Sequence, residues 1–196
     1  MKNITLGELT FAVQDEGDGP AVVLLHGFPD SHTLWRHQVP VLLDAGYRVI
    51  VPDLRGFGES SKPAGVDSYG VLDLVGDVLG ILDSLGVQRT HVVGHDWGAA
   101  LAWATAAFVP DRVDHLAALS VGHPSAFRDV GFVQRQKSWY MLFFQFEDIA
   151  EQAGSCLEQA RAFREQARLI VVGRGYNLST AFEITLKVKE TTGVMA

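Results

Sequence analysis

Short apolar runs alternate with segments of helical periodicity along most of the chain up to residue 121. Residues 9–14 alternate between polar and apolar positions as a strand does, and the polar run 15–20 that follows has the composition of a turn. These segments predict a hairpin at the edge of a sheet. Residues 21–25 form a continuous apolar run, which is typical of a strand buried on both faces of a parallel sheet.

The next segments predict a crossover between parallel strands. Residues 33–45 carry apolar side chains at helical spacing, Gly46 is a favourable helix end, and residues 47–51 form the next apolar run. This order predicts a β–α–β unit, whose connection should be right-handed. Pro40 predicts an interruption within the helix, because proline removes a backbone hydrogen bond and kinks the helix.

Strands and helices continue to alternate after this unit. Residues 52–63 are rich in Gly, Ser and Pro and predict a loop, and residues 69–85 have helical spacing. A strand around 91–93 leads into a helix that ends near Pro110, and residues 113–121 predict a further strand. Such alternation favours an α/β fold with a doubly wound, mostly parallel sheet.

The pattern changes after residue 123. Residues 132–146 are aromatic with helical character, residues 156–170 predict another helix, and residues 182–188 alternate with a period of two, like a strand with one solvated face. We therefore predict a core domain of residues 1–123. Residues 124–196 are predicted to form part of a helical lid and a divergent tail.

Composition narrows the class of protein. The 196 residues are 47% hydrophobic and 20% charged, which suffices for a sizeable core, and the net charge of −7 argues against a nucleic-acid partner. Cys156 is the only cysteine, so an intramolecular disulfide and a cysteine-based metal site are excluded. No apolar leader and no 18-residue uncharged apolar run occurs. We expect a cytoplasmic protein that uses no membrane, metal or cofactor.

The strongest candidate for chemistry is GHDWG at residues 94–98, where a strand meets a helix start. Its glycine spacing matches a tight turn that exposes the apex residue, and the positions flanking such a turn accept only glycine. The apex is Asp96, whose carboxylate is nucleophilic without an activating base and is favoured in ionised form at a helix N-terminus. The alternative interpretation is that Asp96 is an ordinary helix N-cap.

Three blocks in one order carry a family resemblance: HGFP at 26–29, DLRGFGESSKP at 53–63, and GHDWG at 94–98. Together they resemble the α/β-hydrolase superfamily, within it the branch of soluble epoxide hydrolases and haloalkane dehalogenases that uses an aspartate nucleophile. The resemblance extends over residues 1 to about 150. It implies an α/β-hydrolase fold with a mostly parallel sheet and a helical lid.

The resemblance also implies roles for individual residues. Asp96 would attack a carbon of the substrate to form an alkyl-enzyme ester, and the backbone N–H groups of Phe28 and Trp97 would form the oxyanion hole. For His26 the alternative is a strand-end side chain whose polar atoms are satisfied by the neighbouring loop. The residues implied to shape the supporting loops are His26, Gly27, Pro29, Gly94, His95 and Gly98.

Small differences favour one branch of the family. Haloalkane dehalogenases generally have Asn at the position of Phe28, and fluoroacetate-type dehalogenases typically have Arg at the position of Trp97. Tyr140, within KSWYMLFFQ, matches a lid tyrosine that donates a proton to the opening epoxide oxygen; the alternative is packing in an aromatic helix. The resemblance is therefore closest to epoxide hydrolases, and the expected substrate is a small apolar epoxide.

The chain departs from the family pattern after the lid. The family continues into two further strands that carry a second acid and a late histidine, whereas only His115 and His123 follow Asp96 here, and both are expected to be structural. The sequence therefore predicts a C-terminally truncated member with an incomplete sheet edge and impaired turnover. The strand at 113–121 would be an exposed edge that residues 182–188 or a second copy, in a homodimer, could cover.

Three alternatives to an epoxide hydrolase stay open at this stage. The first is a haloalkane or haloacid dehalogenase, which would use the same nucleophile. The second, of another class, is a catalytically dead fragment or a ligand-binding pseudo-hydrolase. The third is an enzyme in which another subunit supplies the histidine.

Overall fold

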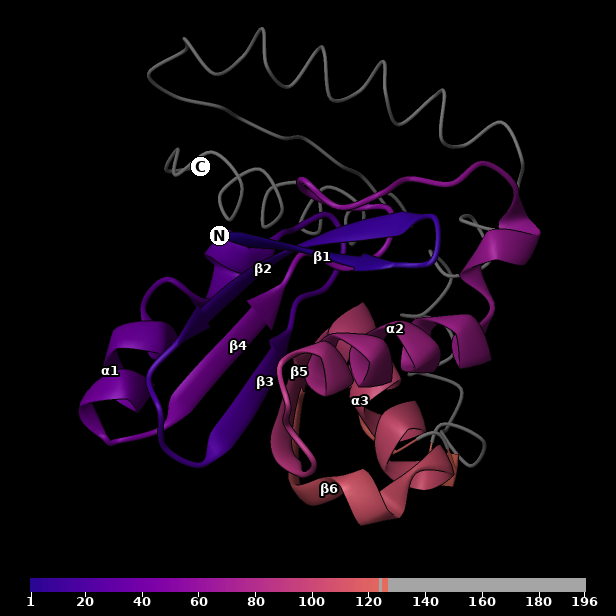
Figure 1. Ribbon diagram of the computed structural model, residues 1–196. Coiled ribbons are helices and arrows are strands. Elements are labelled where there is room, and N and C mark those ends of the chain that lie inside the picture. The colour runs from indigo at the N-terminus through magenta and orange to yellow at the C-terminus, as the bar shows by residue number, and fades with distance from the viewer. Residues whose placement is uncertain (124, 127–196) are drawn as a thin grey trace, which may run out of the picture. The chain divides into compact units, whose positions relative to one another are not determined.

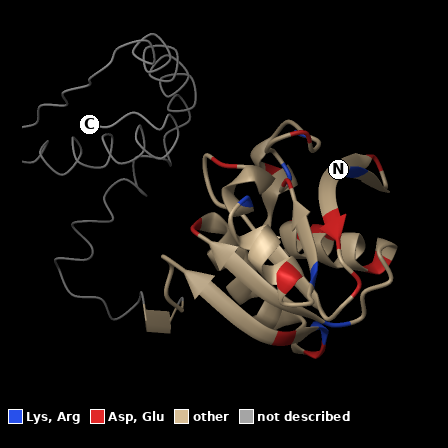
Figure 2. Ribbon diagram, turned by 90° about the vertical axis from the view of Figure 1, so that its left-hand side faces the viewer, with Lys and Arg blue, Asp and Glu red and all other residues tan. Residues whose placement is uncertain are grey.

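A six-stranded mixed sheet forms the centre of the computed structural model, which describes residues 1–123, 125 and 126 (Figure 1). Its strand order is β1-β2-β4-β3-β5-β6. The strands are β1 (Lys2–Leu6), β2 (Leu9–Glu16), β3 (Ala21–Leu25), β4 (Arg48–Pro52), β5 (Thr90–His95) and β6 (Val113–Leu119). Figure 2 shows acidic and basic residues interspersed along the ribbon of this part of the chain.

The sheet is parallel except at one edge. β3 pairs in parallel with β4 and β5, and β5 pairs in parallel with β6, whereas β2 is antiparallel to both β1 and β4. The predicted mostly parallel sheet is confirmed. The predicted hairpin with its turn at 15–20 is wrong, because that run leads from β2 to β3 and β4 lies between these two strands. The hairpin at this edge is formed instead by β1, which was not predicted, and β2, around a turn at residues 7–8.

Three α-helices cover the two faces of the sheet: α1 (Gln38–Asp44), α2 (Val71–Ser84) and α3 (Trp97–Phe108). α1 and a preceding 3₁₀ turn (His32–Trp35) pack over β3 and β4 on one face, and α2 and α3 lie on the other (Figure 1). Two further 3₁₀ turns, Val66–Tyr69 and Pro110–Arg112, lie in the connections.

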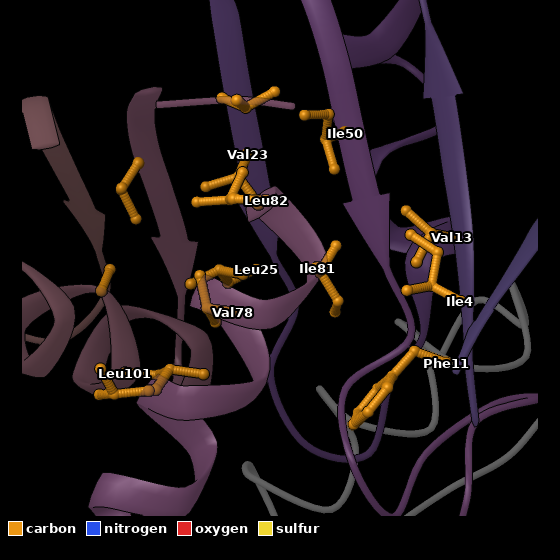
Figure 3. Close-up of a cluster of buried hydrophobic side chains, with 14 residues drawn as sticks. Ile4, Phe11, Val13, Val23, Leu25, Ile50, Val78, Ile81, Leu82 and Leu101 are labelled. Atoms are coloured by element: carbon orange, nitrogen blue, oxygen red, sulfur yellow. The ribbon is translucent and has the colours of Figure 1, made fainter. Parts of the chain in front are cut away.

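Alternate residues of β3 serve two separate cores. Val22 and Leu24 pack with the α1 side, while Val23 and Leu25 lie beside α2 side chains on the other side (Figure 3). All four are almost completely buried. Each such side chain contributes about 1.5–3 kcal/mol of transfer free energy, which explains why the strand has no polar position.

The predicted helix at 33–45 is interrupted. The chain forms the 3₁₀ turn His32–Trp35, leaves helical structure at Arg36, and begins α1 at Gln38. Pro40 lies in the first turn of α1, where its missing N–H has no intrahelical partner to lose. The interruption is thus confirmed, but it precedes the proline rather than coinciding with it.

The other core elements match the predicted pattern with small changes at their ends. α2 covers most of 69–85, and β6 ends at Leu119 because Ser120 has a positive φ of 68°. The helices predicted at 132–146 and 156–170, the segment 182–188 and Tyr140 lie outside the described residues. The boundary at residue 123 stays a prediction.

Candidate active site

Asp96 occupies a tight turn between β5 and α3. Its backbone has φ 55° and ψ −123°, a conformation that non-glycine residues rarely adopt. The turn is fixed on both sides: the Asp96 N–H donates to the Leu119 carbonyl (3.2 Å), and the Asp96 carbonyl accepts from the N–H groups of Ala99 (2.9 Å) and Ala100 (3.2 Å). The strained residue is therefore held by β6 and by the first turn of α3.

The two glycines that flank the turn allow the strand and the helix to approach closely. A Cβ atom on Gly94 would lie 2.2 Å from the Gly98 carbonyl oxygen, and one on Gly98 would lie 2.1 Å from the Leu25 carbonyl oxygen. Both separations are too short for any side chain. The expectation that only glycine fits here is met, and the reason is backbone contact rather than backbone torsion.

The Asp96 side chain turns toward the loop that follows β3. Its Oδ1 accepts a hydrogen bond from the Phe28 N–H at 3.0 Å, and a Cβ on Gly27 would lie 2.4 Å from the Asp96 Cβ. Although Asp96 is at the N-cap position of α3, its side chain makes no capping hydrogen bond. Asp96 thus occupies the N-cap position, but the side-chain hydrogen bond that defines an ordinary N-cap is absent.

His26 joins this loop to the loop after β4. It is completely buried; its Nε2 accepts from the Leu54 N–H (3.0 Å), so Nδ1 carries the proton and donates to the Gly27 carbonyl (2.9 Å). Burial lowers the pKa of His26 and outweighs the opposing effect of the Gly27 hydrogen bond. These contacts match the alternative of a strand-end side chain satisfied by the neighbouring loop. The peptide bond from Phe28 to Pro29 is cis.

Asp53 anchors the loop after β4, and sequence reasoning did not single it out. Its fully buried carboxylate accepts from the His32 N–H (2.7 Å), the His32 Nδ1 (2.8 Å) and the Glu59 N–H (2.9 Å). Burial raises the pKa of this carboxyl, but the three hydrogen bonds outweigh it and the net pKa is lowered. An acid directly after an apolar strand was the available signal.

A second unpredicted pair lies between the same loop and α2. Arg55 holds Asp77 through Nε to Oδ2 (2.8 Å) and Nη2 to Oδ1 (2.6 Å), and it also donates to the Ser68 carbonyl. The Asp77 carboxylate raises the pKa of Arg55. The signal was an acidic residue on the buried face of α2, opposite an arginine in a loop.

The comparisons with known proteins decide the family. The profile of the alpha/beta hydrolase fold family matches residues 20–167, which is more than half of the chain. The chain belongs to the α/β-hydrolase fold family.

Individual relatives of this α/β-hydrolase are epoxide hydrolases. The chain is 42% identical to "Epoxide hydrolase 3" of Siraitia grosvenorii over 153 residues (76% of this chain, 48% of that protein). It is 45% identical to "Epoxide hydrolase B" of Mycobacterium tuberculosis over 148 residues (66% and 41%). A solved structure of a Bacillus megaterium epoxide hydrolase with an inhibitor has a TM-score of 0.71 at 32% identity (77% and 54%). The chain thus spans about half the length of the curated relatives it matches.

The remaining predicted residues of the α/β-hydrolase site fall into two groups. Trp97 begins α3, where the first backbone N–H groups have no intrahelical partner, and His95 ends β5 in register with Leu119. Tyr140 lies outside the described residues. Thus the structure brings together the 26–29 and 94–98 blocks and joins them to the 53–63 block through His26.

The two histidines that follow Asp96 contact other residues. The His115 Nδ1 lies 3.1 Å from the His91 Nδ1, and His91 is roughly 16 Å from Asp96 at about 3.3 Å per strand residue. The His123 ring packs edge-on against Trp103, and its Nδ1 lies 2.6 Å from the Ser125 hydroxyl. No contact between either histidine and Asp96 occurs among the described residues.

The described residues lack two kinds of feature. In residues 1–123, 125 and 126, no group of three or more His, Cys, Asp or Glu side chains is arranged to hold a metal ion. Over the same residues, no helix combines the length and apolar character needed to cross a membrane.

Proposed function

We propose that this α/β-hydrolase is epoxide hydrolase-like and that Asp96 opens an epoxide by forming an alkyl-enzyme ester. The observation that carries the proposal is the hydrogen bond from the Phe28 N–H to the Asp96 Oδ1, made across 68 positions of sequence. It assigns different tasks to the two oxygens of one carboxylate. Oδ1 is held by the loop, and Oδ2 has no hydrogen-bond donor among the described residues.

In the first step Oδ2 attacks an epoxide carbon, and the bond between that carbon and the ring oxygen breaks. The new bond is an ester, and the electron pair of the broken bond moves to the ring oxygen. That alkoxide takes a proton from a hydroxyl donor, the role we propose for Tyr140. Asp96 is suited to the attack because its strained turn exposes it at the end of β5.

In the second step water would attack the ester carbonyl carbon, Cγ of Asp96, and negative charge would develop on Oδ1. The Cγ–Oδ2 bond would then break, so that the diol leaves with Oδ2 as one of its oxygens and the water oxygen stays in the Asp96 carboxylate. The Phe28 N–H already donates to Oδ1, and the Trp97 N–H is the second donor we propose, so the charge would meet preorganised dipoles. Activation of the water requires a base. Because His115 and His123 contact other residues, we expect the 196-residue chain to form the ester and to hydrolyse it slowly.

Intact-protein mass spectrometry after incubation with styrene oxide tests the proposal. We expect the mass to rise by one styrene oxide, peptide mapping to locate the adduct on Asp96, and Asp96→Asn, which is nearly isosteric, to stay unmodified. A folded wild-type chain without an adduct on Asp96 would contradict the proposal. Continuous diol production would retain the nucleophile but show that a base acts on the ester.

Chloride release and ligand binding, measured beside the intact mass, separate the alternatives. A dehalogenase would release chloride from a haloalkane faster than Asp96 is alkylated by styrene oxide. A ligand-binding pseudo-hydrolase would bind apolar ligands without any covalent adduct. Phe28 carries no side-chain amide that could hold a departing halide, so we expect epoxide to react faster than haloalkane.

A further inference from the structure

An apolar pocket of about 310 Å³ lies beside the proposed nucleophile, on the α2 and α3 side of the sheet. Its walls come from the loop after β4, from α2 and from the start of α3, with Leu54, Phe57, Leu74, Val78 and Leu101 among the lining side chains. Figure 3 shows Val78 and Leu101 on neighbouring helices, with Phe11 on β2 across from them. The strongly apolar lining favours a ligand group without charge.

The position of the pocket connects it to Asp96. Phe28 and Trp97 both line it; the Phe28 N–H donates to the Asp96 carboxylate, and Trp97 directly follows Asp96 in the chain. A group that enters the pocket would therefore extend from an atom bound near Asp96. This adjacency distinguishes the pocket from a second, polar depression around Asp15 and Arg48, which lies at the opposite ends of the strands.

The polar groups in the pocket wall are already engaged. Arg55 and Asp77 neutralise each other in a two-point ion pair, and the Tyr69 hydroxyl donates to the Pro63 carbonyl at 3.0 Å. A charged substituent that entered the pocket would lose its hydration and find no unpaired opposite charge to compensate for the free-energy cost. An uncharged aryl or branched alkyl group enters without the free-energy cost of desolvating a charge.

The size of the pocket sets an upper limit for that group. An apolar cavity of roughly 150 Å³ can hold a benzene molecule. A volume of about 310 Å³ therefore accommodates a phenyl ring with a short extension. Such a group would bury apolar surface at about 25 cal/mol per Å².

We propose that this pocket binds the apolar substituent of the epoxide and that Leu74 of α2 limits the size of the substituent, a proposal that rests on the function proposed for Asp96. It places a specificity determinant in the core of the fold in addition to the lid. Leu74 is suited to this role because it lines the pocket and is half-buried. Leu72, on the same helix, is 64% exposed and does not line the pocket.

Leu74→Trp fills the pocket, and Leu72→Trp is the matched control with the same substitution on the same helix. Alkylation rates are measured by intact mass with styrene oxide and with propylene oxide. We expect Leu74→Trp to lower the styrene oxide rate at least tenfold relative to the propylene oxide rate, and Leu72→Trp to leave this ratio within twofold. An unchanged ratio in folded Leu74→Trp, or an equal fall with both epoxides, overturns the proposal. If Leu74→Trp fails to fold by circular dichroism, Leu74→Phe replaces it, with an expected reduction of at least threefold.

A binding experiment distinguishes whether the proposal for the pocket or the proposal for Asp96 is wrong. Toluene is titrated into the Asp96→Asn protein, which cannot form an ester, and the thermal midpoint is followed. We expect saturable stabilisation that Leu74→Trp abolishes and Leu72→Trp retains. Toluene binding without any alkylation of the wild type would support the pocket and contradict the proposed function. Alkylation without toluene binding would contradict the pocket alone.

Discussion

Three carboxylates near the carboxyl ends of the strands have three different environments. Asp53 is fully buried and receives three hydrogen bonds, while Asp77 is held by Arg55 at two points. Asp96 alone combines partial exposure with a single donor, the Phe28 N–H. Asp53 and Asp77 thus stabilise the loop around the site, and their environments differ from that of Asp96, the carboxylate for which we propose the reaction.

Asp53→Asn tests whether the Asp53 carboxylate stabilises the loop around the site. Oδ1 of Asp53 accepts from His32 and Oδ2 accepts from Glu59, so an amide NH₂ in place of either oxygen faces a donor, and we expect a loss of about 2–3 kcal/mol in the free energy of unfolding near pH 7. Asp18→Asn, at an exposed position without a hydrogen-bond partner among the described residues, should change it by less than about 0.5 kcal/mol. Urea unfolding measures both, and equal effects would contradict the anchoring role.

The difference in stability between wild type and Asp53→Asn should depend on pH in a defined direction. Because the folded-state pKa of Asp53 is lowered from 3.8, its contribution is fully present above about pH 4 and is lost as the pH falls through the lower folded value. The stability gap between wild type and Asp53→Asn should therefore narrow below pH 4. A gap that stays constant down to pH 3 would show that the hydrogen bonds do not depend on the charge.

At the scale of elements, the junction of β5 and α3 is tightly constrained by backbone contacts. Gly94 and Gly98 contact backbone carbonyl groups where any side chain would collide, and the Asp96 backbone is held by β6. Local sequence predicted this junction because a glycine pattern directly encodes close approach. The helix at 33–45 was less predictable, since apolar spacing continues through a break that tertiary packing of Trp35 and Val39 decides.

Gly98→Ala should damage this junction. Its Cβ would lie 2.1 Å from the Leu25 carbonyl oxygen, so we expect a loss of about 1–3 kcal/mol in unfolding free energy together with loss of Asp96 alkylation. Gly76→Ala is the matched control, because a Cβ there meets nothing within 4 Å and Gly76 lies inside α2. It should stabilise the protein by about 0.5–1 kcal/mol. Similar effects of both substitutions on unfolding would refute the steric argument.

At the scale of the whole described unit, the site arises where the chain leaves three neighbouring strands. β3, β4 and β5 are parallel, so the loops that begin at His26, Asp53 and Asp96 emerge at one edge of the sheet. β6 is the last strand of the sheet among the described residues. Unpaired backbone groups on such an edge favour pairing with another strand, and we propose a homodimer formed there.

Sedimentation velocity tests the dimer. We expect a concentration-dependent monomer–dimer equilibrium, and Ala117→Lys in β6 should shift it toward the monomer, because a charged side chain on an edge strand opposes pairing. Val41→Lys is the control, since Val41 is 66% exposed on α1, which covers β3 and β4. A monomer at all concentrations, or equal shifts in both variants, would contradict an interface at β6.

The sequence by itself determined the alternation of strands and helices from residue 9 onward, the tight turn at Asp96 and the family, but it predicted neither β1 nor the separate 3₁₀ turn before α1. Periodicity and glycine spacing are local properties, so they can be read without knowing what the segments contact. Only the tertiary structure decided that Phe28 donates to Asp96, that His26 joins two loops, and that Arg55 and Asp77 line a pocket together with Phe28 and Trp97. These contacts join residues distant in sequence, and their geometry depends on which strands become neighbours in the sheet.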